Sequence, residues 1–207
     1  MPNPQAEVRA ERADQADLLA TLTPEQWHAP TLCAGWRVRE VIAHTTMPYR
    51  TSTARVLLDL ARARGDVNRM ADRAARRDAA RMTPDRLIAA LRDNIDHPWT
   101  PPGGGAEGAL SHDLIHGLDI TVGLGLDRRP PPERVGLVLA GLRPRNIGFF
   151  GTDLTGVSLR ATDLDWTYGS GSPGRGAAQD LLLVVCGRRL PPGRLEGPAA
   201  RRFTTAA

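Results

Sequence analysis

Three of the five histidines have a spacing suited to binding one metal ion. His112 and His116 are four residues apart within a predicted helix, so their imidazoles lie on one face, about one turn apart. A third ligand must come from elsewhere, and His44 is the best candidate because it follows Val41 and Ile42 in another predicted helix, where a buried ring needs a partner. Histidine pairs at this spacing also arise by chance, with one ring exposed and the other satisfied in the core. The residues alone leave both interpretations open.

Carboxylate and thiol groups near these histidines are further candidates. Asp119 extends the same helix face at three residues from His116. It is a candidate acid or base, a further metal ligand, or an acceptor that fixes the imidazole tautomer, and a plain surface carboxylate is an equal alternative. Asp113 is expected to point elsewhere, and Cys33 is either a soft fourth ligand or a small buried apolar residue. Two histidines in proline-flanked loops are expected at the surface: His28 and His97.

The elements that must position these residues are mainly helices. Apolar residues recur at helical spacing, and hydroxyl caps followed by proline mark helix starts at Thr23 and Thr83. One long helix is expected from Arg37, kinked at Pro48. The other predicted helices are 7–22, a short one after 23, one after 83, 106–122, 133–142 and 177–186. Alternation over 157–168 predicts a half-exposed strand, followed by a turn or loop at 169–176.

These elements predict a mainly α fold: a four-helix bundle over residues 1–127 followed by a small α+β appendage over residues 128–207. A chain of 207 residues can bury such a core without disulfides. Its two cysteines are far apart in sequence, which argues against a secreted disulfide framework. Neither a signal peptide nor an apolar run of membrane-spanning length is found. We therefore expect a cytoplasmic protein, monomeric or homodimeric, with no membrane association.

The positive charge does not indicate a nucleic-acid binder. The formal net charge is +4 and all 27 basic residues are arginine, which points to the codon usage of a GC-rich genome. The densest basic run, residues 62–81, is interleaved with aspartates and lacks the aromatic residues that stack on bases. A solvated helix face explains it better, so nucleic acid is not expected as a partner.

Three segments resemble one known family. The segment TLCAGWRVREVIAH, which ends at His44, resembles the opening motif of the mycothiol-dependent maleylpyruvate isomerases, which belong to the DinB-like superfamily of metal-binding four-helix bundles. The segment HDLIHGLDI, which begins at His112, resembles the second metal motif of that family. Residues 156–166 and 176–187 are similar to the small C-terminal domain often attached to the bundle. This resemblance implies a DinB-like bundle and metal ligands at His44, His112 and His116.

The resemblance also implies chemistry, with one departure. It implies a divalent metal, zinc by preference, and mycothiol as cosubstrate in an actinobacterial host. The expected activity is S-transfer, or isomerisation by addition and elimination, on a small electrophilic substrate. Where this family often has glutamate, this chain has His112, which puts the isomerase substrate in doubt. A thiol-independent hydrolase, lyase or cyclase and a non-catalytic metal-binding module of the same fold are the alternatives.

Overall fold

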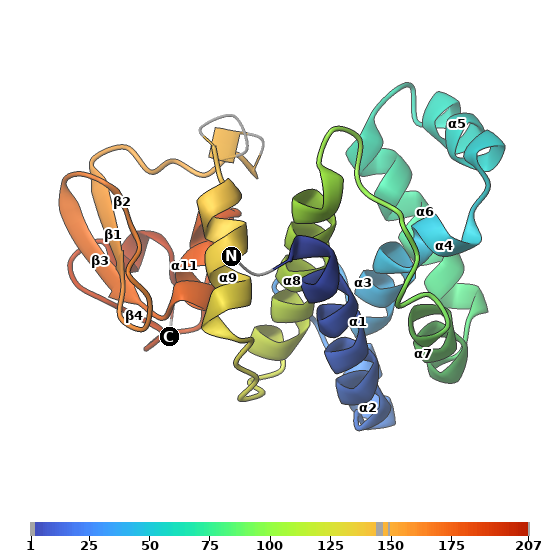
Figure 1. Cartoon of the computed structure of the whole chain (residues 1–207), viewed down its shortest axis with the longest axis horizontal. Coiled ribbons are helices and arrows are strands. Elements are labelled where there is room, and N and C mark those ends of the chain that lie inside the picture. The colour runs from blue at the N-terminus through green and yellow to red at the C-terminus, as the bar shows by residue number, and fades with distance from the viewer. Residues whose placement is uncertain (1–2, 144–146, 149, 207) are drawn as a thin grey trace.

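The computed structural model describes residues 3–143, 147, 148 and 150–206. Figure 1 shows a group of helices formed by the N-terminal part of the chain, beside a small sheet formed by the C-terminal part. Helices α8, α9 and α11 lie between these two ends of the molecule. The predicted mainly α fold with a small α+β C-terminal part is confirmed.

The histidines are carried by a bundle of packed helices. Helix α1 (Pro4–Ala20) packs against α8 (Gly105–Gly123) and α7 (Pro84–Arg92). Helix α3 (Val38–Thr45) packs against α6 (Val67–Arg81) and also touches α8 and α7. Their shared core includes Leu19, Val41, Ile42, Leu87, Leu91 and Ile120. The packing of α3 on α8 is the contact that brings the two predicted metal motifs together.

Helix starts follow the predicted capping residues. Helix α2 (Pro24–His28) has a capping box in which the Thr23 hydroxyl accepts from the Gln26 amide and the Gln26 side chain accepts from the Thr23 amide. The Thr83 hydroxyl caps α7 by accepting from the Arg86 amide, with proline in the first turn of the helix. The predicted helix 106–122 agrees with α8.

The predicted long helix through Pro48 is wrong. Helix α3 ends at Thr45, and two separate helices follow, α4 (Met47–Arg50) and α5 (Thr53–Arg62). Proline lacks an amide hydrogen and its ring clashes with the preceding turn, so it is accommodated in the first turn of a new helix. Ser52 then starts α5 by accepting a hydrogen bond from the Arg55 amide.

The C-terminal part contains helices α9 (Pro132–Gly141) and α11 (Ala178–Val185) and a sheet of order β2-β1-β3-β4. Strand β1 (Val157–Ala161) pairs antiparallel with β2 (Thr167–Gly169) and parallel with β3 (Ser172–Gly176), and β3 pairs antiparallel with β4 (Leu195–Glu196). A 3-10 turn, Ala200–Arg202, follows.

Two sequence predictions fail in this sheet. The predicted strand 157–168 is two strands, and the predicted loop 169–176 contains β3. The glycines of β3 have low strand propensity, so the sequence does not indicate a strand here. Close packing nevertheless requires glycine in this strand. A Cβ atom at Gly176 would lie 2.8 Å from the Leu195 side chain and 2.9 Å from the Arg194 carbonyl oxygen. Low strand propensity therefore gives way to tertiary packing here.

One apolar core joins the bundle to the C-terminal part. It unites α8 residues such as Leu114 and Leu118 with α11 residues such as Leu181 and Leu182. The division of the chain at residue 127 remains a prediction. Within the described ranges, no helix is both long and apolar enough to cross a membrane.

Candidate metal centre

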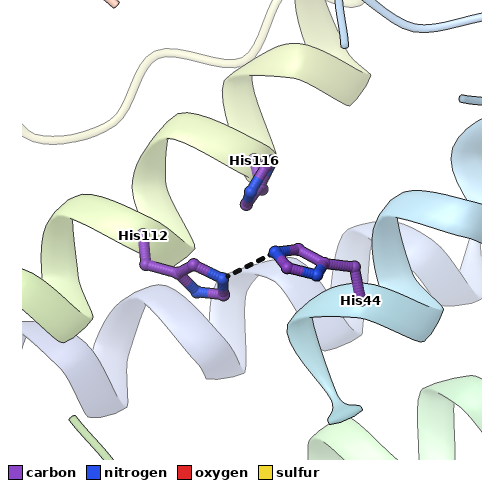
Figure 2. A group of neighbouring side chains, drawn as sticks. All are labelled: His44, His112 and His116. Atoms are coloured by element: carbon purple, nitrogen blue, oxygen red, sulfur yellow. Dashed lines mark hydrogen bonds between the residues drawn. The ribbon is translucent and has the colours of Figure 1, made fainter. Parts of the chain in front are cut away.

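Helices α3 and α8 bring the three predicted ligands together. His112 and His116 project from α8 and His44 projects from α3, and Figure 2 shows the three rings pointing toward one another. One ring nitrogen of each lies within 4.8 Å of the other two. The Nε2 atoms of His112 and His44 are 3.2 Å apart.

Local sequence explains why these helices lie so close. In α8, the spacing of four residues places both rings on the face toward α3. Gly117, next to His116, lets α8 approach α1, because a Cβ atom there would lie 2.7 Å from the Gln15 amide nitrogen. Helix α3 begins one residue after Arg37, whose amide donates to Glu40 at 2.9 Å.

The rings are shielded from water without being sealed off. The side chains of His112 and His116 are 17% and 13% exposed. Burial lowers the pKa of His44 well below its ordinary value, and the neighbouring His116 and His112 lower it further. Burial also lowers the pKa of His116, although Asp119 opposes this effect. At neutral pH His44 and His116 are therefore uncharged, as metal coordination requires.

Asp119 lies behind His116. Its Oδ2 atom is 3.1 Å from His116 Nδ1. Arg188, between α11 and β4, donates from Nε to Oδ1 at 2.8 Å and from Nη2 to Oδ2 at 2.7 Å. Burial raises the pKa of Asp119, but the hydrogen bonds from Arg188 and His116 outweigh it and leave the pKa below its ordinary value. An ionised carboxylate only accepts, so His116 donates from Nδ1 and its Nε2 lone pair is free for an ion.

Asp113 has the equivalent position behind His112, and the prediction that it points elsewhere is wrong. Its Oδ1 atom lies 2.9 Å from His112 Nδ1, and its side chain is buried. Its Oδ2 atom accepts from Arg12 Nε at 2.8 Å. Helical spacing places adjacent residues on different faces and so does not predict this contact. The Asp113 carboxylate nevertheless reaches back to the ring of the preceding residue. By contrast, His44 Nδ1 is buried and has no hydrogen-bond partner among the described residues.

The other candidates take different places. Cys33 forms a second group with His116 and Asp119, its ligand atom lying within 4.8 Å of theirs. Burial, and secondarily the charge of Asp119, raise the pKa of this thiol to about 11, so it is protonated at neutral pH. His28 is exposed as predicted. The surface prediction for His97 is wrong, since it is half-buried with its ring centroid 4.9 Å from that of Tyr49.

Two tryptophans form walls of the centre. The Trp36 ring lies 5.0 Å from the His44 ring and 6.3 Å from the His116 ring, measured between centroids. Its indole nitrogen donates to Asp72 at 2.8 Å, which fixes its orientation. The Trp99 ring centroid lies 5.2 Å from that of His112, and no local sequence pattern predicts this tryptophan at the centre.

The donor set suits a divalent ion. Tetrahedral zinc with metal–nitrogen bonds of about 2.0–2.1 Å separates its ligand nitrogens by roughly 3.3–3.4 Å, close to the 3.2 Å between His112 and His44. Three imidazoles with carboxylates behind two of them match the arrangement of catalytic zinc sites, which leave a fourth position open.

Comparisons with known proteins agree with this fold. Residues 8–97 match the family described as "Mycothiol maleylpyruvate isomerase N-terminal domain". Proteins described as uncharacterised from two strains of Mycobacterium tuberculosis are each 28% identical over 217 residues, covering 89% of this chain and 84% of theirs.

Two solved structures share the architecture. A crystal structure of the mycothiol-dependent maleylpyruvate isomerase is similar with a TM-score of 0.62 and 13% identity, over 95% of this chain and 92% of that chain. A structure of a mutant of the mycothiol-dependent maleylpyruvate isomerase gives 0.58 and 14% over the same shares. At these identities the structures show a common fold, and the family match over residues 8–97 confirms the resemblance seen in the sequence.

Proposed function

We propose that this chain, in which residues 8–97 match the family described as "Mycothiol maleylpyruvate isomerase N-terminal domain", is a metal-dependent enzyme. Its ligands are His44, His112 and His116, and its metal is a divalent ion, zinc by preference. The cosubstrate is a low-molecular-weight thiol, mycothiol. The reaction is S-transfer, or isomerisation by addition and elimination, on a small electrophilic molecule.

The convergence of three imidazoles from two helices supports this proposal most. Two of the rings have Nδ1 occupied by a carboxylate, so their remaining lone pairs face the shared centre. A partly exposed centre can admit a small molecule. When bound there, a divalent ion lowers the pKa of a coordinating thiol and polarises a carbonyl group.

The surrounding residues hold the centre and limit its access to water. The rings of Trp36 and Trp99 pack beside those of His44 and His112. Asp119 is a poor acid or base, because both of its oxygens accept hydrogen bonds from Arg188. We therefore assign it a positioning role: it keeps His116 in the tautomer whose Nε2 lone pair faces the centre.

The histidine at position 112 favours a second candidate function. Three neutral ligands leave the full double charge of the ion available, which suits activation of water as well as stabilisation of a thiolate. A thiol-independent hydrolase, lyase or cyclase is therefore the alternative.

Cobalt substitution separates the two candidates. The thiol-dependent enzyme predicts that mycothiol changes the visible spectrum of the cobalt-loaded protein by adding a sulfur-to-metal charge-transfer band. S-Methyl mycothiol, which cannot form a thiolate, serves as the control and leaves the spectrum unchanged. If mycothiol behaves like its methylated form at millimolar concentration, thiol use is rejected and the alternative is preferred.

A further inference from the structure

We infer that Arg12, acting through Asp113, is a positioning residue that fixes His112 as a metal ligand. This role rests on the proposed metal centre and belongs to a residue of the first helix. Arg12 acts on the centre indirectly, through the Asp113 carboxylate that lies between its guanidinium and the His112 ring.

Arg12 is completely enclosed beside the centre. Its side chain is 0% exposed, and that of Asp113 is 3% exposed. Asp113 divides its two oxygens between two partners: Oδ2 accepts from Arg12 Nε at 2.8 Å, and Oδ1 faces His112 Nδ1 at 2.9 Å. A charged bond from Arg12 therefore determines the direction of the carboxylate that orients the ring.

The same arginine also holds the loop that brings Trp99 beside the His112 ring. Its Nη1 atom donates to the carbonyl oxygen of His97 at 2.8 Å, in the loop that follows α7. Within this loop the Trp99 amide donates to His97 Nδ1 at 3.1 Å, and the Trp99 ring stands edge-on to His112. Arg12 thus holds both the acceptor behind His112 and the loop that carries the indole beside it.

An equivalent arrangement at the other α8 ligand supports a role in positioning. Arg188, Asp119 and His116 form the same arginine–aspartate–histidine series. The Asp119 Oδ2 atom accepts from Arg188 Nη2 at 2.7 Å and lies 3.1 Å from His116 Nδ1. Helix α8 therefore has one arginine-held carboxylate behind each of its two ligands. Both arginine–aspartate–histidine series end on proposed ligands of the same centre. This repetition favours a role in orienting the rings over chance packing.

The positioning role is tested with Asp113→Asn and Arg12→Lys in the full-length protein. Zinc affinity, measured by competition with a chromophoric chelator, should fall about 10–100-fold in Asp113→Asn, as for other partners of metal-bound histidines. Arg12→Lys keeps the charge but loses the fixed geometry of the guanidinium, and the affinity should fall in the same direction. Arg9→Met, one turn earlier on α1 at an exposed position, is the matched control and should bind zinc as the wild type does.

Two further readouts distinguish positioning from general stability. In metal-free protein, nitrogen-15 NMR of the imidazole should show His112 protonated at Nδ1 in the wild type and shifted toward the Nε2-protonated tautomer in Asp113→Asn. In a His112→Glu background, where no ring needs an acceptor, Asp113→Asn should no longer weaken zinc binding.

The possible failures are distinguishable. A wild type that binds no zinc refutes the proposed function. A wild type that binds zinc, with an Asp113→Asn variant that is folded and unchanged in affinity and tautomer, refutes the positioning role. An Asp113→Asn substitution that lowers affinity equally with His112 present and in the His112→Glu background refutes it as well, because the loss then does not pass through the ring.

Discussion

The Nε2 atom of His112 lies 3.2 Å from the Nε2 atom of His44, although the two residues are 68 positions apart in the chain. Because Asp113 occupies His112 Nδ1, the His112 Nε2 atom presents a lone pair to His44. Two such nitrogens are stable at this distance when a proton or a cation lies between them.

Removing the charge of Asp119 should weaken both the fold and the metal centre. In Asp119→Asn the guanidinium of Arg188, only 16% exposed, loses its ionic partner, which should cost about 3–5 kcal/mol in the free energy of unfolding of the metal-free protein. Zinc affinity should fall about 10–100-fold because the charged acceptor behind His116 is replaced by a neutral amide. Urea titration and chelator competition measure the two effects.

Asp127→Asn is the control for that substitution. Asp127 also pairs with an arginine, Arg129, but both side chains are at least 80% exposed. Its effect on unfolding should stay within about 0.5 kcal/mol. Equal effects of the two substitutions would contradict a special role of the Asp119–Arg188 pair.

The metal-free protein should lose stability as the pH falls below about 6.5, the ordinary histidine pKa in an unfolded chain. The folded-state pKa values of His44 and His116 are lowered, so the unfolded chain binds protons that the folded chain does not. Stability therefore rises with pH through this window. Urea unfolding at about pH 5.5 and 7.5 measures the difference, and His44→Ala should reduce it. A free energy of unfolding that is equal at both pH values would refute the neutral, buried state of these rings.

Tryptophan fluorescence should report binding at the centre. Copper(II) or cobalt(II) bound by the three histidines would lie near the indoles of Trp36 and Trp99 and quench their emission. Trp36→Phe and Trp99→Phe should each reduce the quenched fraction. The control is Trp166→Phe, since Trp166 stacks on Tyr168 near the sheet. Quenching that depends mainly on Trp166 would place the ion elsewhere.

The sequence predicts the centre better than its surroundings. The four-residue spacing of His112 and His116 predicts correctly that both rings lie on one helix face. The capping residues Thr23 and Thr83 mark real helix starts. These features depend on short stretches of chain, so local rules suffice. The convergence of His44 with the α8 pair needed the family resemblance, because no local pattern determines how α3 packs on α8.

Features that arise from tertiary contacts could not be predicted in this way. Arg188 is one of 27 arginines and nothing in its local sequence links it to Asp119. Arg12 is equally inconspicuous, 101 residues before Asp113. Strand β3 could not be predicted because its glycines have low strand propensity, and only close packing explains their presence. For the same reason a helical wheel places Asp113 away from the centre, since it ignores the reach of a side chain to its own neighbour.

Elemental analysis of freshly purified protein, with His44→Ala, His112→Ala and His116→Ala beside it, tests the central claim most directly. We predict about one zinc or other divalent ion per wild-type chain. Each of the three variants should retain its helical circular dichroism and bind the ion more than about 100-fold more weakly, while His28→Ala, at an exposed position, should match the wild type. A wild type that stays metal-free in excess zinc, or three variants that retain the ion as the wild type does, would contradict the account.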